Sequence, residues 1–450
     1  MEYLVHFVLT HQEFRFPELL SVCECLDIEI ELPKERDTKR PLMVVRLNDD
    51  ETAHRLASRC ILIKAIYQLW AHGHNYEELH AINRTKCDVW SAYKKVSFKF
   101  NVTSVNQRIP PGRIKETIDS FSYMGFEGCI DMKNPRLTLV CLEDYEEQKV
   151  TQRHRHDNDA KFLQVFFGRL VSEGESRPLI RKFDVKKRAF FGNTTMEAEI
   201  SLLMANQAQA TPGKMIYDPF VGTGSMLYTA AQFGAYVLGS DLDGRQMRGK
   251  GMESVPGIYR AADQYGLSSR VFDLATFDVT KNPWRCGNIF DAIVTDPPYG
   301  VRAGAKRLGR KDETRTPGDS STVPGDGQAN LRLHPPMKPY ELSDLTVDLI
   351  YLARYLLKPG GRLVFFLPTV NDEYDELDIP ECKGMELVSN SLQDFGKWGR
   401  RLITMVKITT NDIGAPRFEG ARTIEYAAPP AHHNFRVKYF EGFQTRDRIH

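Results

Sequence analysis

The sequence lacks an excess of one charge, a long apolar run and a pattern of paired cysteines. Sixty Lys+Arg against fifty-nine Asp+Glu leave a net charge of +1, which argues against holding nucleic acid or membrane by bulk charge alone. No run of about eighteen apolar residues occurs and the start has no basic segment, so we expect neither a membrane span nor a signal peptide. The eight cysteines are scattered, with Cys23 and Cys25 as the one close pair. We therefore expect reduced thiols, a cytoplasmic or nuclear protein and no metal site, and we place it in the cytoplasm.

The length and composition fit a soluble globular protein of several domains. At 450 residues with 42% hydrophobic and 26% charged side chains, about three domains are expected. Mixed strand-like and helix-like patterns predict two compact α+β units over 1–55 and 56–150. The polar run 143–161 predicts a domain boundary and a linker over 151–190.

From about Gly192 the chain repeats the pattern of strand, turn and helix. This pattern predicts an α/β catalytic domain over 191–410, built on a Rossmann-like, doubly wound parallel sheet, with a C-terminal extension over 411–450. Residues 301–340 interrupt it with eight basic and four acidic residues and little periodicity, so we expect a mobile surface insertion there. The predicted strands are 215–217, 236–239, 292–294, 362–367 and 402–407.

The first stretch with chemical content is Asp218-Pro-Phe-Val-Gly222-Thr-Gly224. An apolar strand ends in a carboxylate and turns through two glycines into a helix, so backbone amides face whatever binds there. The third glycine of the dinucleotide fingerprint is missing, and Asp218 stands where an amino group of the ligand would need a carboxylate. These two departures favour S-adenosylmethionine over NAD as the cofactor.

Two further acids fit the same cofactor pocket. Asp241 ends the second strand of the sheet, where a carboxylate binds both ribose hydroxyls, and it is preferred to Asp243 for that reason. Asp278 follows a third short strand near 271 and could accept from the adenine amino group, although Asp273 competes for that role.

Upstream, Thr194-x-x-Glu197 is a capping box that predicts a helix over 197–206. We expect Thr194 at the wall of the cofactor pocket, although an ordinary helix start fits the same residues equally well. The preceding run 181–188 holds five basic residues against one acid, which favours phosphate contacts beside a nucleobase-modifying site.

The most informative stretch is Asp296-Pro297-Pro298-Tyr299-Gly300, directly after an apolar strand. The exocyclic amine of a nucleobase is a poor nucleophile because its lone pair is delocalised into the ring. The Asp296 carboxylate and the Pro297 carbonyl are two acceptors that would bind its N–H groups and leave the lone pair aimed at a methyl donor. Tyr299 offers a ring on which a flat target stacks.

These motifs, with Lys186–Glu199 and Met204–Ala208, resemble the eukaryotic tRNA guanine-N2 methyltransferases that modify the guanosine at position ten. The resemblance implies a ferredoxin-like region over 1–55 and a THUMP-type RNA-docking domain over 56–150. It also implies that Asp296, Pro297 and Tyr299 act on the target amine, while Asp218, Gly222, Gly224, Asp241 and Asp278 line the cofactor pocket. As partners it implies tRNA and a small zinc-binding activator subunit that pairs with the edge of the catalytic sheet.

Two other functions remain open from the residues alone. An amino-methyltransferase of DNA adenine or of a protein glutamine would present a planar conjugated amine to the same motif. A catalytically silent RNA-binding scaffold is the alternative from another class, and it would show no affinity for the cofactor.

Overall fold

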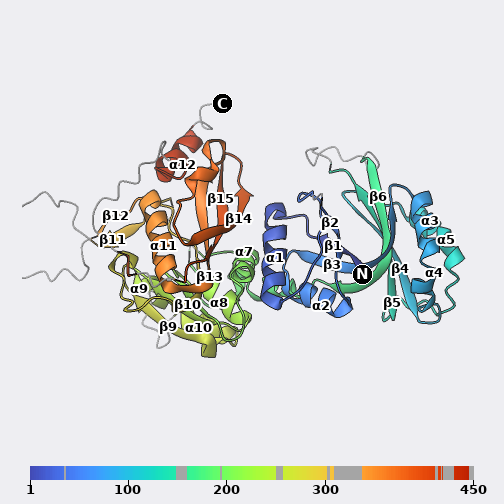
Figure 1. Ribbon diagram of the computed structural model, residues 1–450, viewed down its shortest axis with the longest axis horizontal. Coiled ribbons are helices and arrows are strands. Elements are labelled where there is room, and N and C mark those ends of the chain that lie inside the picture. Colours follow the sequence, from blue (N-terminus) through green and yellow to red (C-terminus); the bar gives the residue numbers. More distant parts are fainter. Residues whose placement is uncertain are drawn as a thin grey trace, which may run out of the picture. The chain divides into compact units, whose positions relative to one another are not determined.

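The computed structural model describes residues 1–34, 37–147, 160–192, 195–249, 257–301, 305–308, 337–410, 414–416, 418 and 430–444. The chain divides into two compact units, Met1–Pro178 and Leu179–His450, whose elements are labelled in Figure 1. Among the described residues, no helix is long and apolar enough to cross a membrane.

The first unit is built on one six-stranded sheet with the order β2-β1-β3-β6-β5-β4. The prediction of two separate units over 1–55 and 56–150 is therefore wrong, because β1 pairs with β3 across that boundary. Neighbouring strands are antiparallel except for the parallel pair of β4 and β5. The helix α5 begins with Pro111 at its first position, where a residue without an amide hydrogen is well tolerated. The strands are β1 (Glu2–Phe7), β2 (Leu42–Arg46), β3 (Ile63–Gly73), β4 (Phe98–Val105), β5 (Leu137–Tyr145) and β6 (Phe162–Glu173), and the helices are α1 (Arg15–Leu26), α2 (Asp50–Arg59), α3 (Tyr76–Thr85), α4 (Cys87–Ser91) and α5 (Pro111–Ser120).

The linker predicted over 151–190 is wrong for its central part. Residues 162–173 form β6, which lies in the middle of the sheet between β3 and β5. The polar run 143–161 therefore connects two neighbouring strands of one sheet and marks no domain boundary. It misled the prediction because strand pairing is set by contacts distant in sequence, which local polarity does not report.

The second unit is built on a seven-stranded sheet with the order β14-β15-β13-β10-β7-β8-β9. The five strands from β13 to β9 are parallel, but β15 is antiparallel to both β13 and β14. The doubly wound α/β architecture is confirmed, whereas the purely parallel sheet is wrong at this end. The strands are β7 (Met215–Asp218), β8 (Tyr236–Asp241), β9 (Val271–Thr276), β10 (Phe290–Thr295), β13 (Leu357–Val370), β14 (Met385–Asp394) and β15 (Trp398–Lys407).

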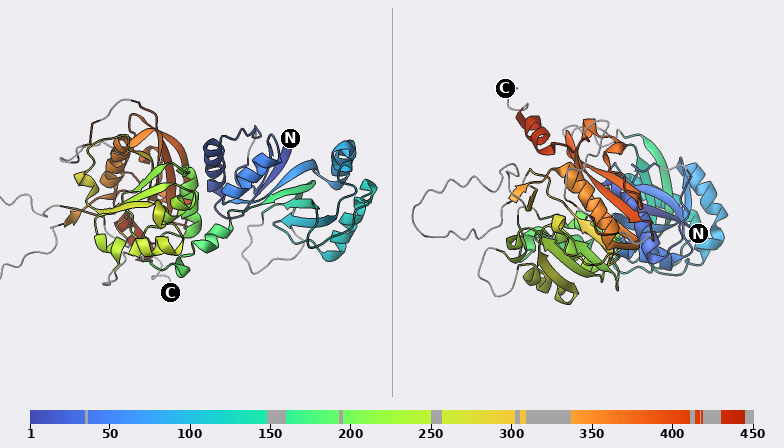
Figure 2. Two further views of the ribbon diagram at one scale, coloured as in Figure 1. Left: turned by 90° about the horizontal axis from the view of Figure 1, so that it is seen from below. Right: turned by 60° about the vertical axis from the view of Figure 1, so that its left-hand side comes forward.

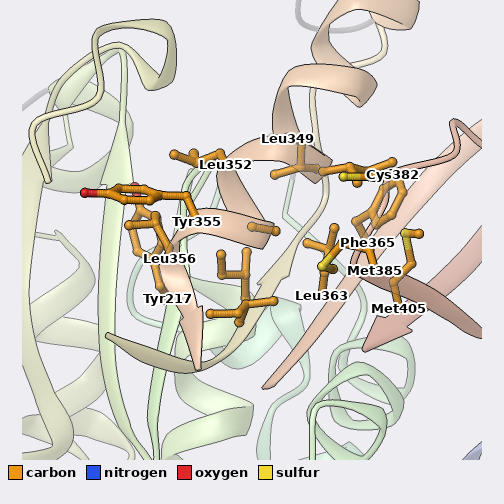
Figure 3. Close-up of a cluster of buried hydrophobic side chains, with 14 of the residues drawn as sticks. Tyr217, Leu349, Leu352, Tyr355, Leu356, Leu363, Phe365, Cys382, Met385 and Met405 are labelled. Carbon is orange, nitrogen blue, oxygen red and sulfur yellow. The ribbon is translucent and has the colours of Figure 1, made fainter. Parts of the chain in front are cut away.

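Helices cover both faces of this sheet (Figures 1 and 2). The buried side chains of α11 pack against one face, in a cluster that includes Tyr217, Leu363 and Phe365 (Figure 3). On the other face α7 contacts the sheet through Gln207, whose carbonyl accepts from Arg362 Nη1 at 2.9 Å. The helices are α6 (Pro178–Lys182), α7 (Ala198–Gln207), α8 (Ser225–Gln232), α9 (Gly244–Arg248), α10 (Gly257–Gln264), α11 (Leu342–Leu356) and α12 (Phe435–Gln444).

The predicted insertion 301–340 lies mostly outside the described residues. Its described parts include two short strands, β11 (Lys306–Leu308) and β12 (Met337–Pro339), which pair antiparallel. Its predicted mobility is not addressed by these residues. About half of the predicted extension 411–450 also lies outside them; its described residues are 414–416, 418 and 430–444, which include α12.

Candidate active site

Three of the predicted acids meet at one edge of the catalytic sheet. Asp218 is the last residue of β7, Asp241 is the last residue of β8, and Asp296 directly follows β10. These strands are parallel neighbours, so their carboxyl ends lie together. The Thr295 hydroxyl, at the end of β10, donates to Asp218 Oδ1 at 2.6 Å. The structure thus places side by side residues that are separated by nearly eighty positions in sequence.

Asp218 is almost fully buried at the base of this edge, with 2% of its surface exposed. Burial raises the pKa of its carboxyl to about 7, an effect that the hydrogen bonds from Thr295 and the Phe220 amide oppose. The negative charges of Asp241 and Asp296 raise that pKa further. The three acids therefore form an electronegative site in which a cationic ligand would relieve their repulsion.

The glycine turn after β7 has the backbone that its sequence predicts. Both glycines are left-handed, with φ of 50° at Gly222 and 85° at Gly224, a region that residues with a Cβ rarely enter. The Gly222 amide donates to Asp241 Oδ2 at 3.0 Å. A Cβ at Gly224 would lie 2.9 Å from Tyr228 Oη, so packing within the protein also requires a glycine at this position.

Asp241 and the alternative Asp243 have different surroundings, and the assignment of the ribose hydroxyls to Asp241 stays a prediction. Burial raises the pKa of Asp241, whose oxygens accept from the Gly222 and Asp243 amides at the edge of the sheet. Asp243 instead caps α9, accepts from the Arg245 amide at 3.1 Å and forms an ion pair with the Arg245 side chain. Asp243 is therefore occupied in starting a helix.

Asp278 is buried, but its oxygens already have protein partners. Oδ1 accepts from the amide and the hydroxyl of Thr280, and Oδ2 accepts from the Leu308 amide at 2.5 Å. Its neighbour Phe277 packs against the hydrophobic core beside Trp284. The competing Asp273 lies exposed on β9. A contact between Asp278 and adenine stays a prediction.

The segment before α7 lies against the glycine turn. Thr194 is outside the described residues, so its predicted role remains a prediction. Its neighbour Thr195 shares a hydrogen bond of 2.9 Å with the hydroxyl of Thr223 in the glycine turn and accepts from the Gly192 amide. The helix begins at Ala198, one residue after the predicted start, with Glu197 as its N-cap and no side-chain cap bond. The predicted capping box is therefore wrong, because it requires Glu197 at the third helical position and not at the cap.

The basic residues of the run 181–188 are not all exposed at the surface. Arg188 is only 3% exposed; its guanidinium donates to Ser225 Oγ at 2.8 Å and lies 4.9 Å from the Tyr228 ring centroid. It thus anchors the start of α8 from within and is unsuited to the phosphate contact expected of it. Arg181, Lys182, Lys186 and Lys187 are exposed.

The Asp296-Pro297-Pro298-Tyr299 segment lies at the same edge and is closed by a hydrogen bond between its first and last side chains. The Tyr299 hydroxyl donates to Asp296 Oδ1. Burial raises the pKa of Asp296 to about 6, against the opposing effects of Arg400 and of the Tyr299 bond. Burial also raises the pKa of Tyr299, which remains a neutral hydrogen-bond donor.

Arg400 is the residue of this site that the sequence analysis missed. It lies on β15, with its side chain 13% exposed, and it hydrogen-bonds Tyr299. Its Nη2 donates to Glu197 Oε1 at 3.1 Å, and its guanidinium stacks 4.3 Å from the Phe366 ring centroid. Arg400 therefore joins the Asp296–Tyr299 turn to the segment before α7. The Arg400-Arg401 pair carries no motif by which it could have been found.

Among the residues that the structure describes, no group of three or more His, Cys, Asp or Glu side chains is arranged to hold a metal ion.

Two family models match this chain, one in each unit. The Tmrp11 THUMP N-terminal domain matches residues 1–176, and the RMKL-like methyltransferase domain matches residues 186–311. Among solved structures, TrmN from Thermus thermophilus is 18% identical with a TM-score of 0.42, covering 91% of this chain and 100% of that one.

Full-length relatives are more similar. The tRNA (guanine(10)-N(2))-methyltransferase of Saccharomyces cerevisiae is 36% identical over 98% of this chain and 99% of its own. That of Schizosaccharomyces pombe is 35% identical over 97% and 96%, and the enzyme TRMT11 of Homo sapiens is 32% identical over 99% and 96%. With such identity along nearly its whole length, the chain belongs to the tRNA (guanine(10)-N(2))-methyltransferase family.

Proposed function

We propose that this protein transfers a methyl group from S-adenosylmethionine to the exocyclic N2 of guanosine 10 in tRNA. The observation that carries the proposal is the meeting of Asp296, at the end of β10, with Asp218, at the end of β7, in a chain of this family. One acid faces the substrate amine and the other faces the cofactor.

The residues present fit S-adenosylmethionine. Asp218 is buried and Asp241 is partly buried. Burial raises the pKa values of both carboxyls, and a ligand with positive ammonium and sulfonium groups would be stabilised among them. The glycine turn between them brings backbone close to the same edge. We assign the amino group to Asp218 and the ribose hydroxyls to Asp241. When bound, the cofactor supplies an electrophilic methyl group on sulfur.

The protein's own contribution is to hold the target amine. The Asp296 carboxylate and the Pro297 carbonyl each accept a hydrogen bond from one N–H group of the amine. These two bonds direct the nitrogen lone pair away from the guanine ring. Tyr299 already donates to Oδ1 of Asp296, so Oδ2 is assigned to the substrate. Arg400 fixes this arrangement through its hydrogen bond to Tyr299, and much of the rate enhancement comes from such positioning.

The test of the function is the identity of the methylated nucleoside. Unmodified tRNA, a DNA duplex and a glutamine-containing protein are each incubated with the chain and labelled S-adenosylmethionine, then digested and analysed by mass spectrometry. The proposal expects N2-methylguanosine at position 10 of tRNA, and product confined to DNA or protein would reject it. Asp296→Asn should reduce turnover by roughly a hundredfold or more with little change in cofactor affinity. Asp243→Asn, a matched change outside the proposed contacts, should leave turnover near the wild-type rate.

We also propose a small zinc-binding activator subunit as the partner, seated on β9. This strand is an edge of the catalytic sheet and carries Phe272, which is 65% exposed, and an exposed apolar edge strand favours pairing with a second chain. Phe272→Asp should abolish co-purification with the activator. Leu387→Asp, on the opposite edge strand β14 where Leu387 is 46% exposed, is the control and should not. If both variants bind the activator equally well, β9 is excluded as its binding site.

We place the protein in the cytoplasm on the strength of its scattered cysteines, which suit a reducing compartment. Imaging of the tagged full-length chain tests this assignment, and accumulation in a secretory compartment would contradict it.

A further inference from the structure

The C-terminal helix α12 is fixed beside the active-site edge by aromatic contacts. Trp398, at the start of β15, meets Phe435 edge-on with ring centroids 6.0 Å apart and Tyr439 with centroids 5.3 Å apart. Phe435 is only 1% exposed. In Figure 1 the helix lies next to β15, and its residues also contact β13. These are the strands that carry Arg400 and its stacking partner Phe366.

Polar contacts hold the same segment at three further points. The Asn434 amide donates to Glu341 Oε1 at 3.1 Å, just before α11 begins. The Ala431 amide donates to Asp378 Oδ2 at 3.0 Å, and Lys438 Nζ donates to Glu373 Oε2 at 2.6 Å. The described part of α12 is therefore docked at a defined place on the catalytic unit.

This docking puts Arg436 against the last residue of the Asp296–Gly300 turn. A Cβ placed on Gly300 would lie 3.6 Å from Arg436 Cβ and 3.9 Å from its Cδ, so the stem of the arginine passes directly over that glycine. Gly300 itself is left-handed, with φ of 85°. Unlike the deeper Arg400, Arg436 is exposed and makes no hydrogen bond or ion pair with the residues that the structure describes.

The outward face of α12 joins this arginine to an aromatic ring. Arg436 and Phe440 are one helical turn apart, and Phe440 is 46% exposed. Residues four apart lie on the same face of a helix. A guanidinium next to an exposed ring is suited to RNA, because the cation binds a phosphate and the ring stacks on a base.

We propose that α12 is a substrate-binding element of the catalytic unit, in which Arg436 binds a tRNA phosphate next to the target guanosine and Phe440 contacts a neighbouring base. The proposal rests on the proposed function and deepens it. Arg436 is a substrate-binding residue that holds the nucleotide beside the turn, while Asp296 contacts its amine.

Steady-state methylation of tRNA, with the activator present, tests the assignment at several salt concentrations. Arg436→Gln should raise the KM for tRNA roughly three- to tenfold with kcat nearly unchanged. It should also reduce the slope of log KM against log salt by about 0.7 to 1, because one phosphate contact is lost. Arg436→Lys keeps the positive charge and should show most of the wild-type salt slope. Phe440→Ala should raise the KM for tRNA without changing the salt slope. A role limited to packing would not alter the salt slope.

Arg285→Gln is the matched control. Arg285 is exposed in the segment before β10, so it lies toward the opposite edge of the sheet from Asp296, and its loss should change neither KM nor slope. If Arg436→Gln matches Arg285→Gln in both quantities, the inference about α12 fails while the proposed function stands. If the wild-type protein forms no methylguanosine in tRNA, the proposed function itself fails.

Discussion

The affinity for S-adenosylmethionine should depend on pH through Asp218. Burial raises the pKa of this carboxyl to about 7 in the free protein, whereas binding of a cationic amino group needs the carboxylate. Below pH 7 the free protein must therefore lose a proton before or as the cofactor binds. At pH 6 only about a tenth of the carboxyl is ionised, so the dissociation constant should be about tenfold larger than at pH 8.

Isothermal titration calorimetry measures both the dissociation constant of the cofactor and the number of protons released when it binds. At pH 6, binding should release close to one proton, about 0.9, which is obtained by repeating the titration in buffers of different ionisation enthalpy. At pH 8 the release should fall to about 0.1. Asp296 has a pKa raised to about 6, so it would titrate in the same pH range. Variants are therefore needed to assign the pH dependence of binding to Asp218.

Thr295→Val is the matched perturbation. The Thr295 hydroxyl donates to Asp218 at 2.6 Å and opposes the rise in its pKa, and valine keeps the shape of threonine without that bond. The midpoint of the pH dependence should therefore move upward. Asp218→Asn should bind the cofactor weakly, with the dependence around pH 7 removed. A wild-type affinity that is constant from pH 5.5 to 8, or an unchanged midpoint in Thr295→Val, would refute the reasoning.

Three other predictions follow from the same geometry. In the cofactor-free protein, Asp218 should contribute stability that is lost as pH rises from about 4 to 7, because the folded state holds the Asp218 proton that the unfolded state has lost. Asp218→Asn should therefore melt at a higher temperature than wild type at pH 8, and an equal or lower melting temperature would contradict this. An alanine at position 224 would combine a φ of 85° with a Cβ only 2.9 Å from Tyr228 Oη, whereas an alanine at position 213 would have a φ of 87° and no atom within 4 Å of its Cβ. Thermal melting should show a loss in the free energy of unfolding of about 1–2 kcal/mol for Gly213→Ala and a larger loss for Gly224→Ala. Equal losses would exclude the packing role of Gly224. Arg400→Lys should lower kcat roughly ten- to a hundredfold with unchanged cofactor affinity, because a lysine cannot contact Tyr299, Glu197 and Phe366 together. Steady-state kinetics measure the first quantity and calorimetry the second. An unchanged kcat would remove Arg400 from the site.

The sequence located the acids of this site because each stands at the end of an apolar strand. Asp218, Asp241 and Asp296 could be placed at one edge because parallel strands expose their carboxyl ends together. Their raised pKa values could not be predicted, since these depend on burial and on the distance between the charges.

Arg400 and β6 were missed for a common reason. Arg400 reaches the site from β15, an antiparallel strand whose pairing with β13 was not apparent from local pattern. The strand β6 was hidden behind a charged segment, although its partner β5 was recognisable as a strand. Its other partner, β3, was misread as helix, because the apolar spacing over 53–70 is also helix-like. In both cases the decisive contacts join residues far apart in the chain, and such pairings leave little trace in hydrophobic periodicity.

The central place of β6 has a consequence for how the N-terminal unit is made. Its order β2-β1-β3-β6-β5-β4 puts the last strand to leave the ribosome between two strands made earlier. Until residue 173 has been synthesised, β3 and β5 each expose a backbone edge that only β6 covers in the finished sheet. The nascent chain would carry two incomplete half-sheets, and a fragment ending near residue 150 should aggregate instead of folding. The segment that reads as a linker is thus the piece that closes the unit.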